Sequence, residues 1–260
     1  MEMKAVLAQT HISWENKAHN YKKAEYMIKE SAQKGAGIVF FPEMSFTGFS
    51  MNIEVTGETR QETVKKMAEY SAEYGIYIGF GWVNLREGKA ENHYSVAAPS
   101  KEIILDYIKI HPFSYGKENT YFRPGDTIVS CQAEELPMTA FICYDLRFPE
   151  LFQAVQEPTT LAVVAANWPE SRREHWKLLL KARAVENQIY IAGVNCTGST
   201  GGVSYSGDSC LISPNGRQLQ SLEYEEGLIF CEIGDEAKTQ RESFPFRKDR
   251  RKSLYRTWYE

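Results

Sequence analysis

The common cofactor and metal signatures are missing from this chain of 260 residues. It has no G-x-G-x-x-G stretch and no Walker loop, which excludes the usual nucleotide-binding motifs. Its five histidines show no H-E-x-x-H spacing, and its five cysteines include no C-x-x-C pair. We therefore expect neither a metal nor a cofactor. An odd number of cysteines also argues against a disulfide framework and fits a reducing cytoplasm.

Strong positive charge and long apolar runs are missing too. The formal net charge is -4, whereas a general nucleic-acid binder is normally basic. No apolar run approaches the length of a membrane span, and no basic region followed by an apolar one begins the chain. The basic residues at 247–252 are better explained by a solvated segment or a subunit contact. We expect a cytoplasmic protein that binds neither nucleic acid nor membrane.

What is present is the composition of an ordinary globular protein, with 43% hydrophobic and 25% charged residues. Strand and helix patterns alternate, without a linker or repeat, so residues 1–260 are expected to form one domain. Ten strands are predicted at 4–9, 38–41, 76–83, 92–98, 103–110, 139–142, 160–166, 189–195, 209–213 and 228–232. Helices are predicted at 16–34, 59–74, 148–156 and 171–188.

This order of elements predicts an α/β fold. One open sheet rarely exceeds about ten strands, so we expect two stacked mixed sheets flanked by helices, a four-layer α-β-β-α sandwich. Residues 111–136 read as a long loop, which in a compact domain is usually functional. The helix at 171–188 is expected to begin with a capping box of Ser171 and Glu174 and to place Val185 on its apolar side.

Cys143 follows an apolar strand abruptly, and Pro149 begins a predicted helix six residues later. A cysteine at such a turn, near the positive end of a helix, is favoured as a reachable thiolate. The alternative is a small buried hydrophobic residue, as most free cysteines are. This segment alone leaves the two interpretations about equal.

Polar residues also end other buried strands. Glu43 follows the strand at 38–41, Lys109 ends the strand at 103–108, and Asn167 follows the strand at 160–166. Sites in α/β folds gather at the carboxyl ends of strands, so these residues converge if the ends share one edge. Taken singly, Glu43 could be an exposed loop carboxylate and Lys109 a surface lysine with a buried stem.

Three segments, in order, carry a family resemblance: FFPEMSFTGF at 40–49, YIKIH at 107–111 and ICYDLRFPE at 142–150. They resemble the three signatures of the nitrilase superfamily, the carbon–nitrogen hydrolases. The resemblance extends from Val6 to about Phe246. It implies an α-β-β-α sandwich that dimerises into an eight-layer stack.

The resemblance also implies roles for individual residues. Glu43, Lys109 and Cys143 would form the catalytic triad, and Glu118 in the following loop would match the family's second glutamate. The implied enzyme hydrolyses a linear amide through a thioester on Cys143. Glu43 would act as the base, and Lys109 with the backbone N–H of Tyr144 would bind the oxyanion.

Three further segments, NWP at 167–169, HW at 175–176 and KARAVENQ at 181–188, resemble the ω-amidase branch. That branch hydrolyses 2-oxo dicarboxylic acid monoamides such as 2-oxoglutaramate and 2-oxosuccinamate. An anionic substrate needs a cation, for which Arg147, Arg172 and Arg173 are candidates, although an arginine at a helix start is more often solvated. Trp168 and Phe49 are candidate pocket walls, with core packing as the equal alternative.

Other functions remain open at this point. A nitrilase, a carbamoylase or an aliphatic amidase would use the same catalytic residues on another substrate. A nitrilase-like domain that only binds or assembles is the alternative of another class, and a thiol redox role lacks a nearby resolving cysteine. The segment at 240–259 is rich in arginine and aromatic residues, a composition favoured at interfaces, so we expect a homodimer in which 240–260 contacts the partner.

Overall fold

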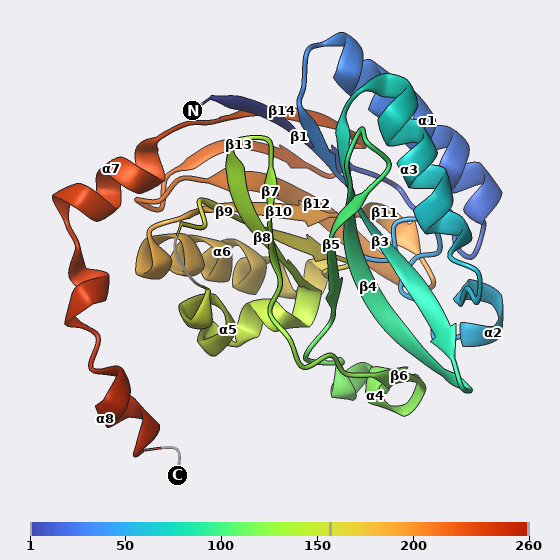
Figure 1. Cartoon of the computed structure of the whole chain (residues 1–260). Coiled ribbons are helices and arrows are strands. Elements are labelled where there is room, and N and C mark those ends of the chain that lie inside the picture. Colours follow the sequence, from blue (N-terminus) through green and yellow to red (C-terminus); the bar gives the residue numbers. More distant parts are fainter. Residues whose placement is uncertain (1, 156–157, 259–260) are drawn as a thin grey trace.

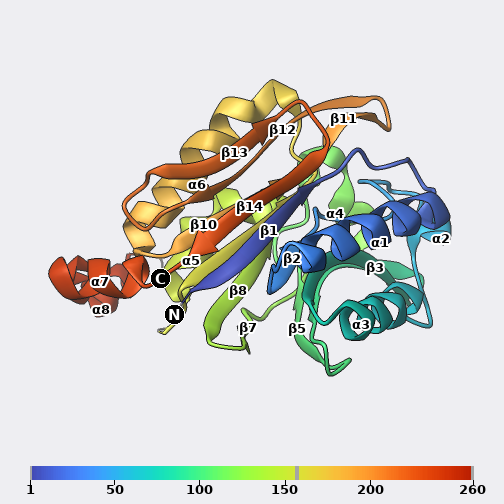
Figure 2. The same ribbon diagram turned by 90° about the horizontal axis from the view of Figure 1, so that it is seen from above.

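The computed structural model describes residues 2–155 and 158–258. Within these ranges, two seven-stranded mixed sheets lie face to face (Figures 1 and 2). The first sheet has the order β14 (Gly227–Ile233), β1 (Met3–Gln9), β2 (Ile38–Phe40), β3 (Tyr77–Arg86), β4 (Lys89–Ala97) and β5 (Ile103–Ile108), with β6 (Phe122–Arg123) beside β4. The second has the order β11 (Thr197–Thr200), β12 (Val203–Ile212), β10 (Tyr190–Asn195), β9 (Leu161–Ala166), β8 (Leu136–Ile142) and β7 (Ser130–Ala133), with β13 (Gln218–Glu223) beside β12.

Helices cover the outer faces of both sheets. α1 (Lys17–Gln33) and α3 (Glu62–Tyr74) lie on the first sheet, and α5 (Pro149–Ala154) and α6 (Arg173–Asn187) lie on the second (Figure 2). Short helices α2 (Ile53–Thr56) and α4 (Glu118–Tyr121) lie in connections, and α7 (Glu236–Ser243) and α8 (Lys252–Arg256) form the C-terminal arm (Figure 1). In the described part of the chain, no helix is long and apolar enough to cross a membrane.

Strand β1 shows how the sequence produces these layers. Side chains alternate between the two faces of a strand. Ala5 and Leu7 belong to the core between the two sheets, whereas Val6 and Ala8 pack with α1 and α3. Both faces are buried, so the strand reads as a continuous apolar run. The predicted four-layer α-β-β-α sandwich is confirmed.

The strand directions bring the expected site residues to one edge. β2 is parallel to β1 and β3, and β8, β9 and β10 are parallel to one another. β4 runs antiparallel to both β3 and β5, so β5 points in the same direction as β3. The carboxyl ends of β2 and β5 therefore meet at one edge of the first sheet, and those of β8 and β9 meet in the second.

Several local predictions were wrong. The loop at 111–136 contains α4, β6 and β7, and β11 and β13 were missed. No side chain caps α6, because a 3-10 turn at Glu170–Arg172 comes first and moves the helix start beyond Ser171. Val185 is 45% exposed, since it lies one residue, about 100°, around the helix from the buried Ala184. The predicted helix end at Gln156 lies outside the described residues, as does Tyr259.

Candidate active site

Cys143 occupies a strained turn at the end of β8. It begins a 3-10 turn, Cys143–Arg147, with φ at 45°, a left-handed conformation that costs free energy in a residue other than glycine. Asp145 holds this turn: its Oδ2 accepts hydrogen bonds from the backbone N–H of Ile142 at 3.1 Å and the hydroxyl of Tyr107 at 2.8 Å. The strand therefore ends abruptly, and Cys143 lines a cavity while it also packs against the core.

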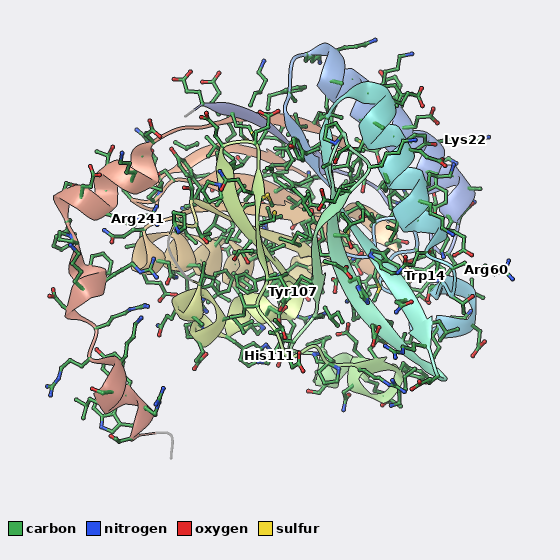
Figure 3. All side chains as sticks on the ribbon, viewed as in Figure 1. Trp14, Lys22, Arg60, Tyr107, His111 and Arg241 are labelled. Atoms are coloured by element: carbon green, nitrogen blue, oxygen red, sulfur yellow. The ribbon has the colours of Figure 1, made fainter. Side chains whose placement is uncertain are left out.

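Asp145 also connects this turn to the segment that follows β5. Its Oδ1 accepts a hydrogen bond from the backbone N–H of His111 at 3.0 Å and lies 2.9 Å from Nδ1 of the same residue. Tyr107 and His111 lie together at one end of β5 (Figure 3). One buried carboxylate thus aligns the segment that carries Lys109 with the turn that carries Cys143.

Glu43, Lys109, Glu118 and Asn92 form a buried group that we call the Lys109 cluster. The Lys109 ammonium lies 2.8 Å from Oε1 of Glu43 and 2.9 Å from Oε2 of Glu118. The amide of Asn92 donates to both carboxylates, at 2.8 Å to Glu43 and 3.0 Å to Glu118. The structure therefore brings the expected Glu43, Lys109 and Glu118 into direct contact.

The opposite charges in this cluster stabilise one another's ionised forms against the effect of burial. Burial alone would lower the pKa of Lys109, but the carboxylates of Glu118 and Glu43 outweigh burial and raise it. Lys109 therefore stays positive. Burial raises the pKa of Glu118, and the ammonium of Lys109 opposes that rise. Glu118 is also held by the backbone N–H of Phe113, which donates to its Oε2 at 2.5 Å.

The second carboxylate oxygen of Glu43 is aimed toward the second sheet. Oε2 accepts one hydrogen bond, from the backbone N–H of Asn167 at 3.0 Å. The side chain of Asn167 in turn donates to the backbone carbonyl of Glu43 at 2.6 Å. Glu43 is thus fixed between the ends of β2 and β9, while an oxygen with one accepted bond retains capacity for another donor.

The thiol of Cys143 does not have the lowered pKa that its position before a helix suggested. Burial raises its pKa well above the ordinary value, the negative charge of Glu43 raises it further, and the nearby Lys109 only partly opposes both. The sequence left a reachable thiolate and a buried cysteine about equal, and the raised pKa argues against a resting thiolate. A reaction that uses this sulfur as a nucleophile needs a base to remove its proton.

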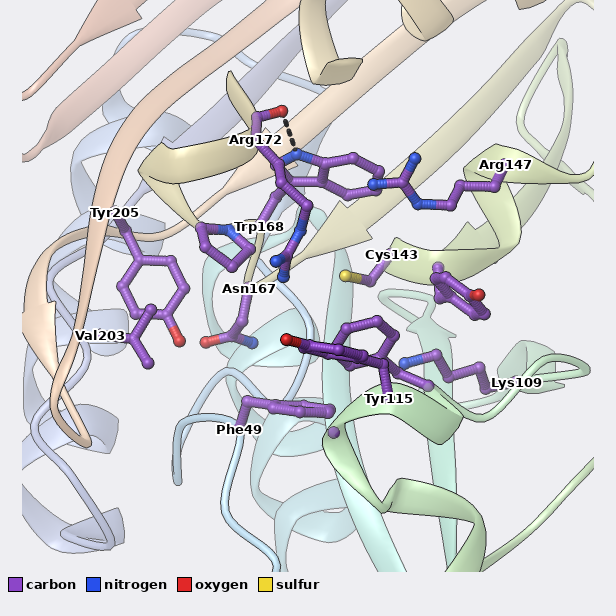
Figure 4. Close-up of a pocket in the computed structure, with 14 residues that line it drawn as sticks. Phe49, Lys109, Tyr115, Cys143, Arg147, Asn167, Trp168, Arg172, Val203 and Tyr205 are labelled. Atoms are coloured by element: carbon purple, nitrogen blue, oxygen red, sulfur yellow. Dashed lines mark hydrogen bonds between the residues drawn. The ribbon is translucent and has the colours of Figure 1, made fainter. Parts of the chain in front are cut away.

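The cavity next to Cys143 has a volume of about 240 Å³ (Figure 4). This is below the roughly 300–1,000 Å³ typical for drug-sized ligands, so it suits a small molecule. Its walls are Phe49, Lys109, Phe113, Tyr115, Gly116, Cys143, Tyr144, Arg147, Asn167, Trp168, Pro169, Arg172, Val203 and Tyr205. Across residues 2–155 and 158–258, no three His, Cys, Asp or Glu side chains are grouped to hold a metal ion.

The three candidate arginines have different environments. Arg147 and Arg172 line the cavity, and neither forms an ion pair with a carboxylate of the described residues. The Arg147 guanidinium stacks over Trp168, at 4.7 Å from the ring centre, and Arg172 lies over Phe113 at 5.4 Å. Burial, and then the positive charge of Arg172, lower the pKa of Arg147.

Arg173 is not brought into the cavity. Its guanidinium binds Asp208 at 2.7 Å and Glu223 at 3.0 Å, so its charge is already compensated. Arg172 ends the 3-10 turn before α6 and lines the cavity, whereas Arg173 begins α6 and does not. The candidates Tyr144, Trp168, Phe49 and Arg147 all line the cavity.

Sequence reasoning missed Asn92, Asp145 and Tyr205. Asn92 lies inside a predicted strand, and its polar side chain on a buried face was the available signal. Asp145 lies two residues after Cys143 within the third signature. Tyr205 lies on β12, in a hairpin with β11 that the sequence pattern did not predict.

Comparison with known proteins gives a consistent result. The carbon-nitrogen hydrolase family model matches residues 4–241. A 2-oxoglutaramate amidase of Bacillus subtilis is 35% identical, covering 95% of this chain and 97% of that protein. An omega-amidase of Escherichia coli K12 is 29% identical, covering 95% and 96%. A CN-hydrolase superfamily structure from Xanthomonas campestris, with an arsenic adduct in its active site, has a TM-score of 0.91 at 26% identity, covering 96% and 97%.

Proposed function

The chain belongs to the carbon–nitrogen hydrolases, and on that premise we propose that it is an ω-amidase. It would hydrolyse the terminal amide of a 2-oxo dicarboxylic acid monoamide, such as 2-oxoglutaramate or 2-oxosuccinamate, to the acid and ammonia. One observation carries the substrate class: Arg147 and Arg172 line the cavity beside Cys143 without carboxylate partners among the described residues. A substrate carboxylate supplies the missing negative charge. The similarity to a 2-oxoglutaramate amidase supports the same choice.

Catalysis in this proposal begins with Glu43. Its carboxylate takes the proton of Cys143, and the sulfur attacks the amide carbon. The carbonyl oxygen becomes negatively charged and is stabilised by the Lys109 ammonium and the backbone N–H of Tyr144. One such donor typically lowers a barrier by about 2.7–4 kcal/mol. Glu43 then gives its proton to the amide nitrogen, the C–N bond breaks, and ammonia leaves a thioester on Cys143.

The second half of the reaction uses the same groups. Glu43 takes a proton from a water molecule, which attacks the thioester carbon and releases the carboxylic acid. The thiol of Cys143 regains its proton. Glu118 positions Lys109 throughout, because both of its carboxylate oxygens bond the ammonium, at 2.9 and 3.1 Å. Glu43 and Lys109 face the reacting atoms, whereas Glu118 acts through Lys109.

Ammonia release tests this function directly. We would supply 2-oxoglutaramate, with glutamine and asparagine in parallel, to the wild-type protein and to Cys143→Ala. We expect fast release from the 2-oxo amide, slow or no release from the two amino acids, and none from the variant. Equal release from all three amides would contradict the substrate class. Release by Cys143→Ala at the wild-type rate would contradict the nucleophile.

We further propose that residues 1–260 act as one hydrolase domain that forms a homodimer through its C-terminal arm. The arm extends from the body of the fold (Figure 1) and exposes Phe244 and Trp258. Large exposed aromatic residues are typical of interfaces. Truncation before Gln240 should convert a dimer to a monomer or unfold it in sedimentation experiments. A truncated protein that remains dimeric would contradict this role for the arm.

A further inference from the structure

The cavity contains few polar groups that are free to bind a substrate. In the proposed reaction Lys109 and Cys143 act on the amide. Asn167 is bonded to Glu43 and the Trp168 indole to the carbonyl of Arg172, so the two arginines and three tyrosines remain for the rest of the substrate. None of the lining residues is an aspartate or a glutamate. The described walls therefore offer hydrogen-bond donors and positive charge, with no carboxylate to receive a cation.

The three tyrosines differ in burial. Tyr115 is 85% exposed at the mouth of the cavity, and Tyr144 is half-buried. Tyr205 is 4% exposed, and its hydroxyl has no hydrogen-bond partner among the described residues. The hydroxyl points into the cavity from β12 (Figure 4). The ring is therefore buried while the hydroxyl stays accessible from the cavity, where a bound ligand can supply its hydrogen bond.

The ring of Tyr205 is held in place. It packs with Ile12 and Cys196 in a small apolar cluster, and its backbone pairs with Gly198 of β11. Burial raises the pKa of Tyr205, and the negative forms of Cys196, Cys143 and Glu43 raise it further, while Arg172 opposes them. The phenol thus keeps its proton. It also lies within electrostatic range of both the reactive thiol and Arg172.

We propose that Tyr205 is a specificity-determining residue, whose hydroxyl donates a hydrogen bond to the 2-oxo oxygen of the substrate. This inference rests on the proposed function. With the terminal amide at Cys143 and the carboxylate at the arginines, the 2-oxo group lies next to the carboxylate and needs a donor. A 2-amino group at the same position carries a positive charge, which would face Arg147 and Arg172 with no carboxylate on the described walls. The cavity therefore selects a 2-oxo acid amide over the corresponding amino acid.

The test compares two substrates that differ only in the 2-oxo oxygen. We would measure kcat/KM for 2-oxoglutaramate and for glutaramate, the monoamide of glutaric acid, with wild-type protein and Tyr205→Phe. The variant removes one oxygen and keeps the ring in its apolar cluster. We expect kcat/KM for 2-oxoglutaramate to fall roughly tenfold, the value of one net hydrogen bond, and kcat/KM for glutaramate to stay unchanged. Tyr26→Phe, on the exposed face of α1, is the matched control and should change neither value.

Equal losses on both substrates would overturn the inference, since they would indicate a general effect on the cavity wall. No loss on either substrate would overturn it as well. Binding of 2-oxoglutarate and glutarate, measured by calorimetry, provides a readout without turnover, and Tyr205→Phe should weaken only the former, again roughly tenfold. If the wild-type protein releases ammonia from neither amide, the proposed function fails. If it releases ammonia and the variant shows no substrate-dependent difference, only the role of Tyr205 fails.

Discussion

Among the charged clusters of the described residues, two differ clearly in burial. In the Lys109 cluster, the side chains of Lys109, Glu43 and Glu118 are at most 1% exposed. The second group, which we call the Asp208 cluster, consists of Asp208, Arg173, Lys177 and Glu223. There only the side chain of Asp208 is buried.

The difference explains what each cluster does. Transferring charged groups out of water costs free energy unless they are closely paired. Buried charges also interact strongly with one another. The Lys109 cluster can therefore control protons and charge next to Cys143. In the Asp208 cluster, Arg173 and Lys177 remain partly in water, where ion pairs are weak. That cluster joins the first turn of α6 to β12 and β13, and so supports the wall that carries Arg172.

Removing one lysine from each cluster should give the largest difference in the free energy of unfolding. Lys109→Met leaves two buried carboxylates without a cation, so we expect the free energy of unfolding to fall by about 3–5 kcal/mol. The matched variant Lys177→Met removes a partly exposed charge from Asp208 and Glu223, which keep Arg173, and should cost about 1 kcal/mol or less. Urea denaturation measures both. Similar losses would contradict the distinction between the clusters.

Glu118→Gln should show that Glu118 matters more for positioning Lys109 in catalysis than for the folding stability of the protein. The substitution keeps the shape of the side chain and removes the charge that faces Lys109. Since a hydrogen bond to a charged group is worth about 1.5–3 kcal/mol, we expect kcat to fall roughly 10- to 100-fold. The free energy of unfolding should change less than in Lys109→Met, because one carboxylate remains paired with the ammonium. A Glu118 variant with full activity would contradict the role of Glu118 in positioning Lys109.

Asp208→Asn should give the smallest effect, visible as a change in acid stability. Burial alone would raise the pKa of Asp208, but Arg173, Ser206 and Lys177 hold it below the ordinary value of 3.8. A lowered folded-state pKa contributes stability above pH 3.8 that is lost as the pH falls through the folded value. The wild-type unfolding free energy should therefore decline more steeply than that of the variant between about pH 5 and pH 2. We would measure the unfolding free energy of both proteins by urea denaturation across this pH range. If it fell equally for both, the lowered pKa of Asp208 would be contradicted.

The sequence was a good guide to the residues that end buried strands. Glu43, Lys109 and Cys143 each follow an apolar run, and the polar residue at the end of such a run is visible without a structure. The parallel strand directions then bring these ends together. The direction of the Cys143 pKa shift was not predictable, because it depends on how deeply the turn is covered and on the distance to Glu43.

Residues whose role depends on orientation were harder to predict. Whether Arg172 or Arg173 faces the cavity depends on where α6 begins, and helix ends are uncertain by one or two residues. Tyr205 could not be predicted because β11 is short and lacks a clear apolar alternation. Asn92 resembled an ordinary strand residue, and only the approach of β2 and α4 gives its amide two carboxylates to bind.

The central claim is that Glu43 is the base for a thiol that is otherwise held protonated. Glu43→Gln tests it by two readouts on the same protein: ammonia release from 2-oxoglutaramate, and alkylation of Cys143 by iodoacetamide at neutral pH. Loss of the base should slow ammonia release by roughly 10²- to 10⁴-fold. Alkylation also uses the sulfur as a nucleophile, and burial, the main cause of the raised pKa of Cys143, remains in the variant, so loss of the base should slow alkylation as well. A variant that is alkylated at the wild-type rate, or in which ammonia release persists, would contradict this role of Glu43.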